Sequence, residues 1–297
     1  MEINFNVIYL PENQGHGNAR RVSLEQCTNE LVALMDADDI SLPNRFEKQI
    51  QMFQKDKTLD IVGGQITEFI GEPTNIIGKR MVPESDIEIK KYIKKRCPMN
   101  QVSVMFKKSF YNQVGGYIDW YCEEDYFLWI RMFEHGGMFA NLPDTLVNVR
   151  VGNAMSARRG GWKYFFSEAK LQKYMLDKKI ISIFRYLYNI AIRFCGEIIL
   201  TNKLRTIVYK ILRENNETVN NLHSVDVKEK YDKKDYFSFS VAMCVYGGDN
   251  PEHFDEALRS IVEQSLKPDE IVLVVDGAIP DEIQLVIDKY DKNRYKE

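Results

Sequence analysis

No apolar run in the sequence approaches the ~20 residues that a helix needs to cross a bilayer. The five cysteines are odd in number and form no CxxC pair, which argues against a disulfide framework or a thiolate zinc site and indicates reduced thiols in the cytoplasm. Because polar and charged residues follow Met1, we expect no signal peptide. A net charge of −3 on 297 residues gives no general attraction to nucleic acid.

Charge is nevertheless distributed unevenly along the chain. Residues 170–213 contain ten Lys or Arg and two acids, a balance of +8 that leaves −11 for the remainder. The pattern is helical from residue 162 to 213, and residues 180–194 combine Ile, Tyr and Phe with Arg185 and Arg193. A basic helix with a wide apolar face fits a membrane surface. Packing on the domain, or an oligomer contact, is the alternative.

The central stretch is an apolar strand that runs into acids. Residues 31–35 suit a strand buried on both faces of a parallel sheet, and Asp36, Asp38 and Asp39 follow at its carboxyl end, where open α/β sheets bind ligands. Residues two apart in an extended segment point the same way, so the first two carboxylates converge. A hard divalent cation would relieve their repulsion. The alternative is an acidic cap for a helix that begins near Pro43.

Two further polar stretches are candidates for a site. Glu123, Glu124 and Asp125 stand at the start of a predicted helix, where one or two acids would satisfy the helix dipole and three make a site plausible. Arg158 and Arg159 precede two glycines in a basic turn, which suits a phosphate or carboxylate or is simply a solvated loop.

Elsewhere strands and helices alternate. Strands are expected over 3–10, 59–64, 102–106, 142–151, 239–245 and 270–275, and helices over 19–27, from 43, over 87–95, 123–134, from 249 and over 281–289. Residues 71–83 are expected to form turns, and 215–235 a polar linker. Placed before the first forty residues, the last sixty complete one alternating unit, which is typical of a doubly wound α/β sheet.

Motifs along this joined order resemble those of the inverting family 2 glycosyltransferases, which have the GT-A fold, a mostly parallel Rossmann-like α/β sheet flanked by helices. The first strand of that family resembles residues 239–246, its second strand resembles 269–277, and the stretch before its third helix resembles 13–21. Its DxD motif resembles Asp36-Ala37-Asp38, its GG[FY] motif resembles Gly115-Gly116-Tyr117, and its ED motif resembles Glu124-Asp125-Tyr126. The carboxyl end of the family resembles residues 204–213.

The resemblance covers nearly the whole chain in rotated order, and it predicts a circular permutant, natural or engineered. Residues 1–213 would form the acceptor and metal part with a helical extension over about 162–213. Residues 214–235 would link the original termini, and 236–297 would supply the nucleotide-binding first half of the same domain. The rival interpretation is a fragment that runs from one transferase domain into the next.

The resemblance implies transfer of a sugar, with inversion, from a nucleotide-diphosphate donor such as a UDP-sugar to a hydroxyl of a cell-surface polysaccharide or glycolipid. It implies Mn²⁺ or Mg²⁺ at Asp38, with Asp36 in the metal shell or at the ribose, and Asp125 as general base with Glu124 beside it. For the nucleotide it implies Tyr246, Asp276 and Arg20 or Arg21; the weaker donor or acceptor candidates are Asn100, Gln101, Arg158 and Arg159.

Where many relatives have a second acid after the position of Asp276, this chain has Gly277. The expected partners are the nucleotide-sugar, a saccharide or lipid-linked saccharide, and the inner face of the cell membrane, touched peripherally through residues of about 180–213. Two alternatives remain. A sugar-1-phosphate nucleotidyltransferase would need a basic residue in the turn after Tyr246, which has none; a non-catalytic interaction protein would keep the fold without the activity.

Overall fold

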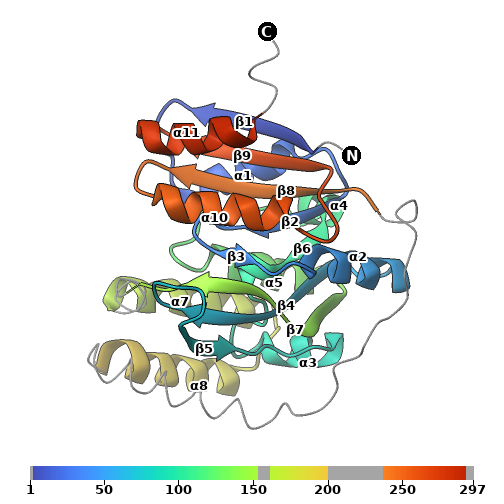
Figure 1. Ribbon diagram of the computed structural model, residues 1–297. Coiled ribbons are helices and arrows are strands. Elements are labelled where there is room, and N and C mark those ends of the chain that lie inside the picture. The colour runs from blue at the N-terminus through green and yellow to red at the C-terminus, as the bar shows by residue number, and fades with distance from the viewer. Residues whose placement is uncertain (1–2, 153–160, 200–236, 292–297) are drawn as a thin grey trace.

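The computed structural model describes residues 3–152, 161–199 and 237–291 (Figure 1). We call residues 3–199 the head and residues 237–291 the tail. The head contains β1 (Asn4–Leu10), α1 (His16–Gln26), β2 (Leu31–Met35), β3 (Ile40–Ser41), α2 (Arg45–Lys55), β4 (Ile61–Phe69), β5 (Ile76–Arg80), α3 (Asp86–Tyr92), η1 (Gln101–Ser103), β6 (Met105–Lys107), α4 (Lys108–Gln113), α5 (Glu124–Glu134), β7 (Phe139–Arg150), α7 (Trp162–Asp177), α8 (Ile183–Phe194) and the π-helical turn η2 (Cys195–Ile199). The tail contains β8 (Phe239–Tyr246), α10 (Pro251–Val262), β9 (Glu270–Asp276) and α11 (Asp281–Tyr290).

Head and tail share one nine-stranded sheet, in the order β1-β9-β8-β2-β6-β4-β7-β3, with β5 paired to β4. The two tail strands therefore lie between two head strands. The pairs β1–β9, β9–β8 and β8–β2 are parallel, while β6 runs antiparallel to both of its neighbours. The prediction that the two ends of the chain meet in one α/β sheet is confirmed.

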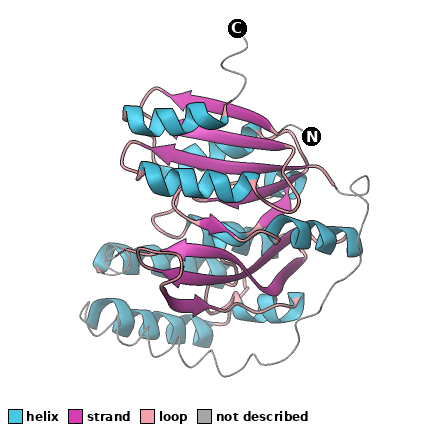
Figure 2. Cartoon of the chain, in the orientation of Figure 1, coloured by secondary structure: helices cyan, strands magenta, loops and turns pink. Residues whose placement is uncertain are grey.

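Helices cover both faces of the sheet (Figure 2). Side chains alternate across each strand, so in β2 Leu31 and Ala33 join one core and Val32 and Leu34 the other. The first core is closed by α2, α10 and α11, and the second by α1, α3, α5 and α7. The tail strand β9 is buried at every position, as its uninterrupted apolar run predicts.

Several local predictions were wrong. Residues 71–83 include β5, which pairs with β4 in a hairpin. Residues 102–106 are split between η1 and β6, and the expected continuous helix from residue 162 breaks at 178–182. There Lys179 takes a left-handed backbone, φ 58°, and the Ser182 hydroxyl caps α8 by accepting from Arg185 N–H. Residues 200–213, the linker 214–235 and the Arg158-Arg159 turn lie outside the described residues.

The five cysteines all lie within the described residues, and no two of them are joined by a disulfide. Across residues 3–152, 161–199 and 237–291, no helix combines the length and apolar character that spanning a bilayer requires.

Candidate active site

The site forms where the sheet changes direction of winding. From β8 the chain passes through α10 to β9 on one side, while β2 pairs with β8 on the other side. Neighbouring parallel strands whose connections leave in opposite directions open a crevice at their carboxyl ends. Tyr246 ends β8, and Asp36 follows the last residue of β2. Head and tail therefore each supply one side of this crevice.

Carboxylates gather at this edge without full compensation of their charge. Burial raises the pKa of Asp38 to about 6, helped by the negative charges of Asp36 and of Asp249 from the tail. Asp39 is 2% exposed, and burial together with the negative charges of Asp36 and Asp38 raises its pKa well above the usual value. It is held in place by the backbone N–H of Arg150, which donates to Oδ1 over 2.9 Å.

This donor set fits a hard cation only in part. No three His, Cys, Asp or Glu residues within the described ranges are arranged as a preformed metal cage. The exposed Asp38 and the half-buried Asp36 nevertheless supply oxygen ligands where repulsion between carboxylates favours a counter-charge. Mg²⁺ and similar ions commonly bind through one or two carboxylates, completed by water and substrate phosphate. The residues present are compatible with that mode of binding.

Arg20 connects the two acidic motifs. Its side chain is 5% exposed and lies on α1, with Nη2 3.0 Å from Asp36 Oδ1 and Nη1 3.9 Å from Glu124 Oε1. The guanidinium also stands over the ring of Tyr117, 5.7 Å from its centroid. Burial lowers the pKa of Arg20, but the surrounding groups, Asp36 foremost, outweigh burial and raise it. One buried cation thus joins Asp36, Glu124 and the GG[FY] turn.

The two arginines predicted for the nucleotide, Arg20 and Arg21, point in different directions from α1. Arg21 faces solvent on α1 and pairs with Glu25 over 2.6 Å, away from the contacts of Arg20. Of the weaker candidates, Gln101 joins the site indirectly, because its amide donates to Tyr117 Oη over 3.0 Å. Asn100 is 1% exposed and donates to the backbone oxygen of Gly64, so it supports the sheet.

The acids of the ED motif begin α5. Glu124 is half-buried, and burial raises its pKa, followed by the charge of Asp125. Asp125 is also half-buried, and its Oδ1 accepts from the N–H of Tyr126 over 2.6 Å. The preceding Glu123 accepts from the Tyr164 hydroxyl of α7 over 2.6 Å. The motif is therefore fixed to α7 on one side and reaches Arg20 on the other.

Asp276 holds the glycine-rich turn in front of α1. Its Oδ1 accepts from Gln14 N–H over 2.7 Å and its Oδ2 from Gly15 N–H over 3.0 Å. Gly277 follows with φ 83°, and a Cβ there would lie 2.6 Å from Asn13 N. The glycine that replaces the second acid of many relatives is therefore required by the close approach of the tail to the head.

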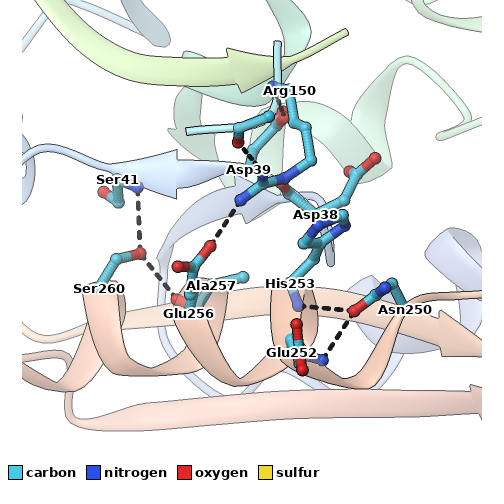
Figure 3. A network of polar contacts seen from close by, with 11 residues as sticks. Asp38, Asp39, Ser41, Arg150, Asn250, Glu252, His253, Glu256, Ala257 and Ser260 are labelled. Atoms are coloured by element: carbon cyan, nitrogen blue, oxygen red, sulfur yellow. Dashed lines mark hydrogen bonds and ion pairs between the residues drawn. The ribbon is translucent and has the colours of Figure 1, made fainter. Parts of the chain in front are cut away.

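Arg150 ties the acid loop to the tail (Figure 3). From the end of β7 its guanidinium donates to Asp38 O over 3.2 Å and Gly71 O over 2.7 Å, and pairs with Glu256 of α10 over 2.5 Å. Sequence reasoning did not identify Arg150, and it placed Asp249 only at the start of a predicted helix. Neither position carried a motif, and strand order alone could have placed the turn after β8 beside Asp36.

Comparison with known proteins finds similarity to glycosyltransferases. The Glycosyl transferase family 2 model matches residues 1–113. An uncharacterised glycosyltransferase of Haemophilus influenzae is 39% identical over 208 residues, which cover 70% of this chain and 77% of that protein. The amylovoran biosynthesis glycosyltransferase AmsE of Erwinia amylovora is 36% identical over 173 residues, 58% of this chain and 64% of AmsE.

A third relative has a named reaction. The UDP-Gal:alpha-D-GlcNAc-diphosphoundecaprenol beta-1,3-galactosyltransferase of Escherichia coli is 34% identical over 211 residues, which cover 71% of this chain and 76% of that enzyme. The expected fold class, a mixed α/β sheet of the GT-A type, agrees with both the strand order and these relatives. The chain belongs to glycosyl transferase family 2.

Proposed function

We propose that this glycosyltransferase moves a sugar from a nucleotide-diphosphate donor, a UDP-sugar in the first instance, to a saccharide hydroxyl with inversion at the anomeric carbon. The observation that carries this proposal is the position of Arg20, 3.0 Å from Asp36 and 3.9 Å from Glu124 at the winding switch of the sheet. The acids expected at the leaving group and the acids expected at the acceptor thereby belong to one site.

A circularly permuted domain is part of the proposal. Read from β8, the chain gives β8, β9 and β1 as successive parallel neighbours and then returns to β2 on the far side of β8. This is the 3-2-1-4 order of a doubly wound nucleotide-binding sheet. Residues 236–297 would thus be the first part of the domain and residues 1–213 the remainder. In a domain that is not permuted, a loop would join α11 to β1, and the rearrangement would have opened the chain at that loop.

Asp125 is assigned as general base. It would accept the proton of the acceptor hydroxyl while that oxygen bonds to the anomeric carbon. The bond from this carbon to the donor phosphate oxygen breaks at the same time, and its electron pair leaves with the diphosphate. Glu124 and Arg20 hold the start of α5 toward the β2 edge. A base on one face and a leaving group on the other give a single displacement, and hence inversion.

The leaving group and the nucleotide would be bound on the β8 and β2 side. A divalent cation held by Asp38 and Asp36 would act as a Lewis acid on the diphosphate. Tyr246 would contact the nucleoside, and the exposure of its side chain at the end of β8 supports this assignment. Asp276 would act by holding the turn at Gln14, because its carboxylate already accepts two backbone N–H groups.

Release of UDP from a panel of UDP-sugars, with Mn²⁺ or Mg²⁺ and saccharide acceptors, tests the proposal. Asp125→Asn and Asp38→Asn should each lower turnover by at least ~100-fold, the size of a general-base or metal contribution. Asp119→Asn, an exposed acid that precedes α5, is the matched control and should keep full activity. Full activity of Asp125→Asn would remove the assigned base, and inactivity across the whole panel would favour the non-catalytic alternative.

The acceptor class is inferred from relatives. One of them acts on a GlcNAc-diphosphoundecaprenol, so we propose a lipid-linked saccharide for this chain too. Such an acceptor lies at a membrane surface, which makes a peripheral contact through residues of about 180–213 part of the proposal. GlcNAc joined through a diphosphate to a short, water-soluble lipid tail should be a better acceptor than free GlcNAc.

A further inference from the structure

Helix α8 contacts the domain mainly through polar side chains and exposes its large apolar side chains. Its single buried residue is Asn189, whose amide donates to Lys94 O over 2.9 Å and to Gln172 Oε1 over 2.8 Å. On the same side, Arg193 pairs with the buried carboxylate of Glu168 and donates to Lys95 O over 3.0 Å. A helix on a globular domain ordinarily packs its apolar side inward. Here polar side chains, together with the partly buried Tyr186, attach the helix to the domain.

The apolar side of α8 faces outward instead. Phe184 is 82% exposed, and Leu187, Tyr188 and Ile192 follow at spacings of three, four and eight residues, each more than half exposed. These spacings place all four side chains on one face of the helix. A single exposed leucine needs no explanation, but a continuous apolar face does.

The same surface continues onto α7. Trp162 and Phe166 are 56% and 61% exposed, and their rings stack with centroids 5.8 Å apart. Trp162 also contacts Phe194 at the end of α8, with centroids 6.2 Å apart. We call these six residues, Trp162, Phe166, Phe184, Leu187, Tyr188 and Ile192, the apolar surface.

The charge around the apolar surface indicates what covers it. Residues 161–199 carry seven Lys or Arg against three Asp or Glu, a balance of +4 in a chain whose net charge is −3. A second copy docked about a twofold axis would place this basic segment against itself. A bilayer with anionic headgroups complements it, and Trp and Tyr are the residues that favour the headgroup level.

We propose that the apolar surface docks on an anionic lipid bilayer, with α8 lying in the plane of the headgroups. This deepens the peripheral contact proposed above, while the docking itself requires no donor, acceptor or cation. The contact would also lie close to the reaction. Tyr164, two residues after Trp162, holds Glu123 at the start of α5, next to the assigned base. A lipid-linked acceptor would then meet the site from the membrane side.

Flotation with vesicles tests the docking. The full chain should float with phosphatidylcholine vesicles containing about one third phosphatidylglycerol, and bind pure phosphatidylcholine more weakly, because basic residues add to the apolar term. Phe184→Ser combined with Leu187→Ser should lower the bound fraction at least about tenfold, since two large apolar groups leave the bilayer. Leu285→Ser on α11, 69% exposed and far along the chain, is the matched control and should bind as the parent does.

Four measurements decide the outcome: the thermal midpoint, turnover, flotation and light scattering. The double variant should keep the parent's thermal midpoint and its turnover on a water-soluble acceptor, so that loss of flotation reports docking alone. Equal flotation of parent and double variant would overturn the proposal. So would a parent that stays unbound with both vesicle types but forms a dimer that Phe184→Ser dissociates in light scattering, because a second copy would then cover the surface. Loss of turnover in Asp125→Asn with normal flotation would separate catalysis from docking.

Discussion

Replacing Arg20 by Met should destabilise the protein and move its activity to higher pH. Arg20 and its two acids are mostly shielded, with side-chain exposures of 5% for Arg20, 28% for Asp36 and 22% for Glu124. At an effective dielectric constant of about 20, unit charges 3.0 Å and 3.9 Å apart attract by about 5.5 and about 4 kcal/mol. Most of this is offset by desolvation of Arg20, so the net loss should be about 2–4 kcal/mol.

The pH dependence has a definite sign. Burial and Asp125 raise the pKa of Glu124, and Arg20 lowers it. Without Arg20 the pKa of Glu124 rises further, so the carboxylate forms only at higher pH. If the ionised motif is needed for transfer, the acid limb of the pH profile of kcat/KM moves upward.

Arg21 supplies the matched control for both measurements. It is the next residue on α1, but it is exposed and pairs with Glu25 within the same helix. Arg21→Met should change the free energy of unfolding by no more than about 0.5 kcal/mol, as is usual for exposed helix pairs, and leave the pH profile in place. Urea denaturation and UDP release measure the two effects. Equal destabilisation by the two substitutions, or an unmoved acid limb in Arg20→Met, would refute the reasoning.

Three further predictions concern the acid loop and the junction of head and tail. Because the pKa of Asp38 is raised to about 6, protons should compete with Mn²⁺ below that pH, and calorimetry should show the affinity falling about tenfold per pH unit. Without cation, the contribution of this carboxyl to folding stability is complete below about pH 4 and is lost as the pH rises through 6, so Mn²⁺ should raise the thermal midpoint more at pH 7.5 than at pH 5. Arg150→Met and Glu256→Gln should show a coupling of about 1–3 kcal/mol in a double-mutant cycle of unfolding, and additive losses would contradict the ion pair. Gly277→Ala should lower stability by at least about 1 kcal/mol because of its positive φ and the close contact with Asn13, whereas Gly152→Ala, which meets no atom within 4 Å, should not.

The sequence predicted the large features because they depend on local patterns. Residues 31–35 and 271–275 are apolar at every position, and such runs form buried parallel strands. Pairing of head with tail followed from counting strands on either side of the join. The same reasoning failed where tertiary contact decides. Residues 76–80 lack a strong strand pattern and become β5 only because β4 offers a partner edge.

The site was predictable in its motifs and not in its connections. Asp36 and Glu124 were identified, but nothing in their spacing indicates that Arg20 would lie between them. Arg20 and Arg21 are identical residues side by side, and only the helical phase of α1 decides which one faces the sheet. Asp249, in the turn after β8, comes near the site only because of the strand order, and the linear sequence does not show that order.

Placing β9 and β8 between β1 and β2 has a consequence for biosynthesis. Until residues 239–276 have left the ribosome, β1 and β2 have a gap two strands wide between them. The nascent head would then expose the unpaired edges of both strands, which invite association with other chains. The domain should therefore become compact only after residues 239–276 have emerged, and a chain cut before residue 237 should depend on chaperones to remain dispersed.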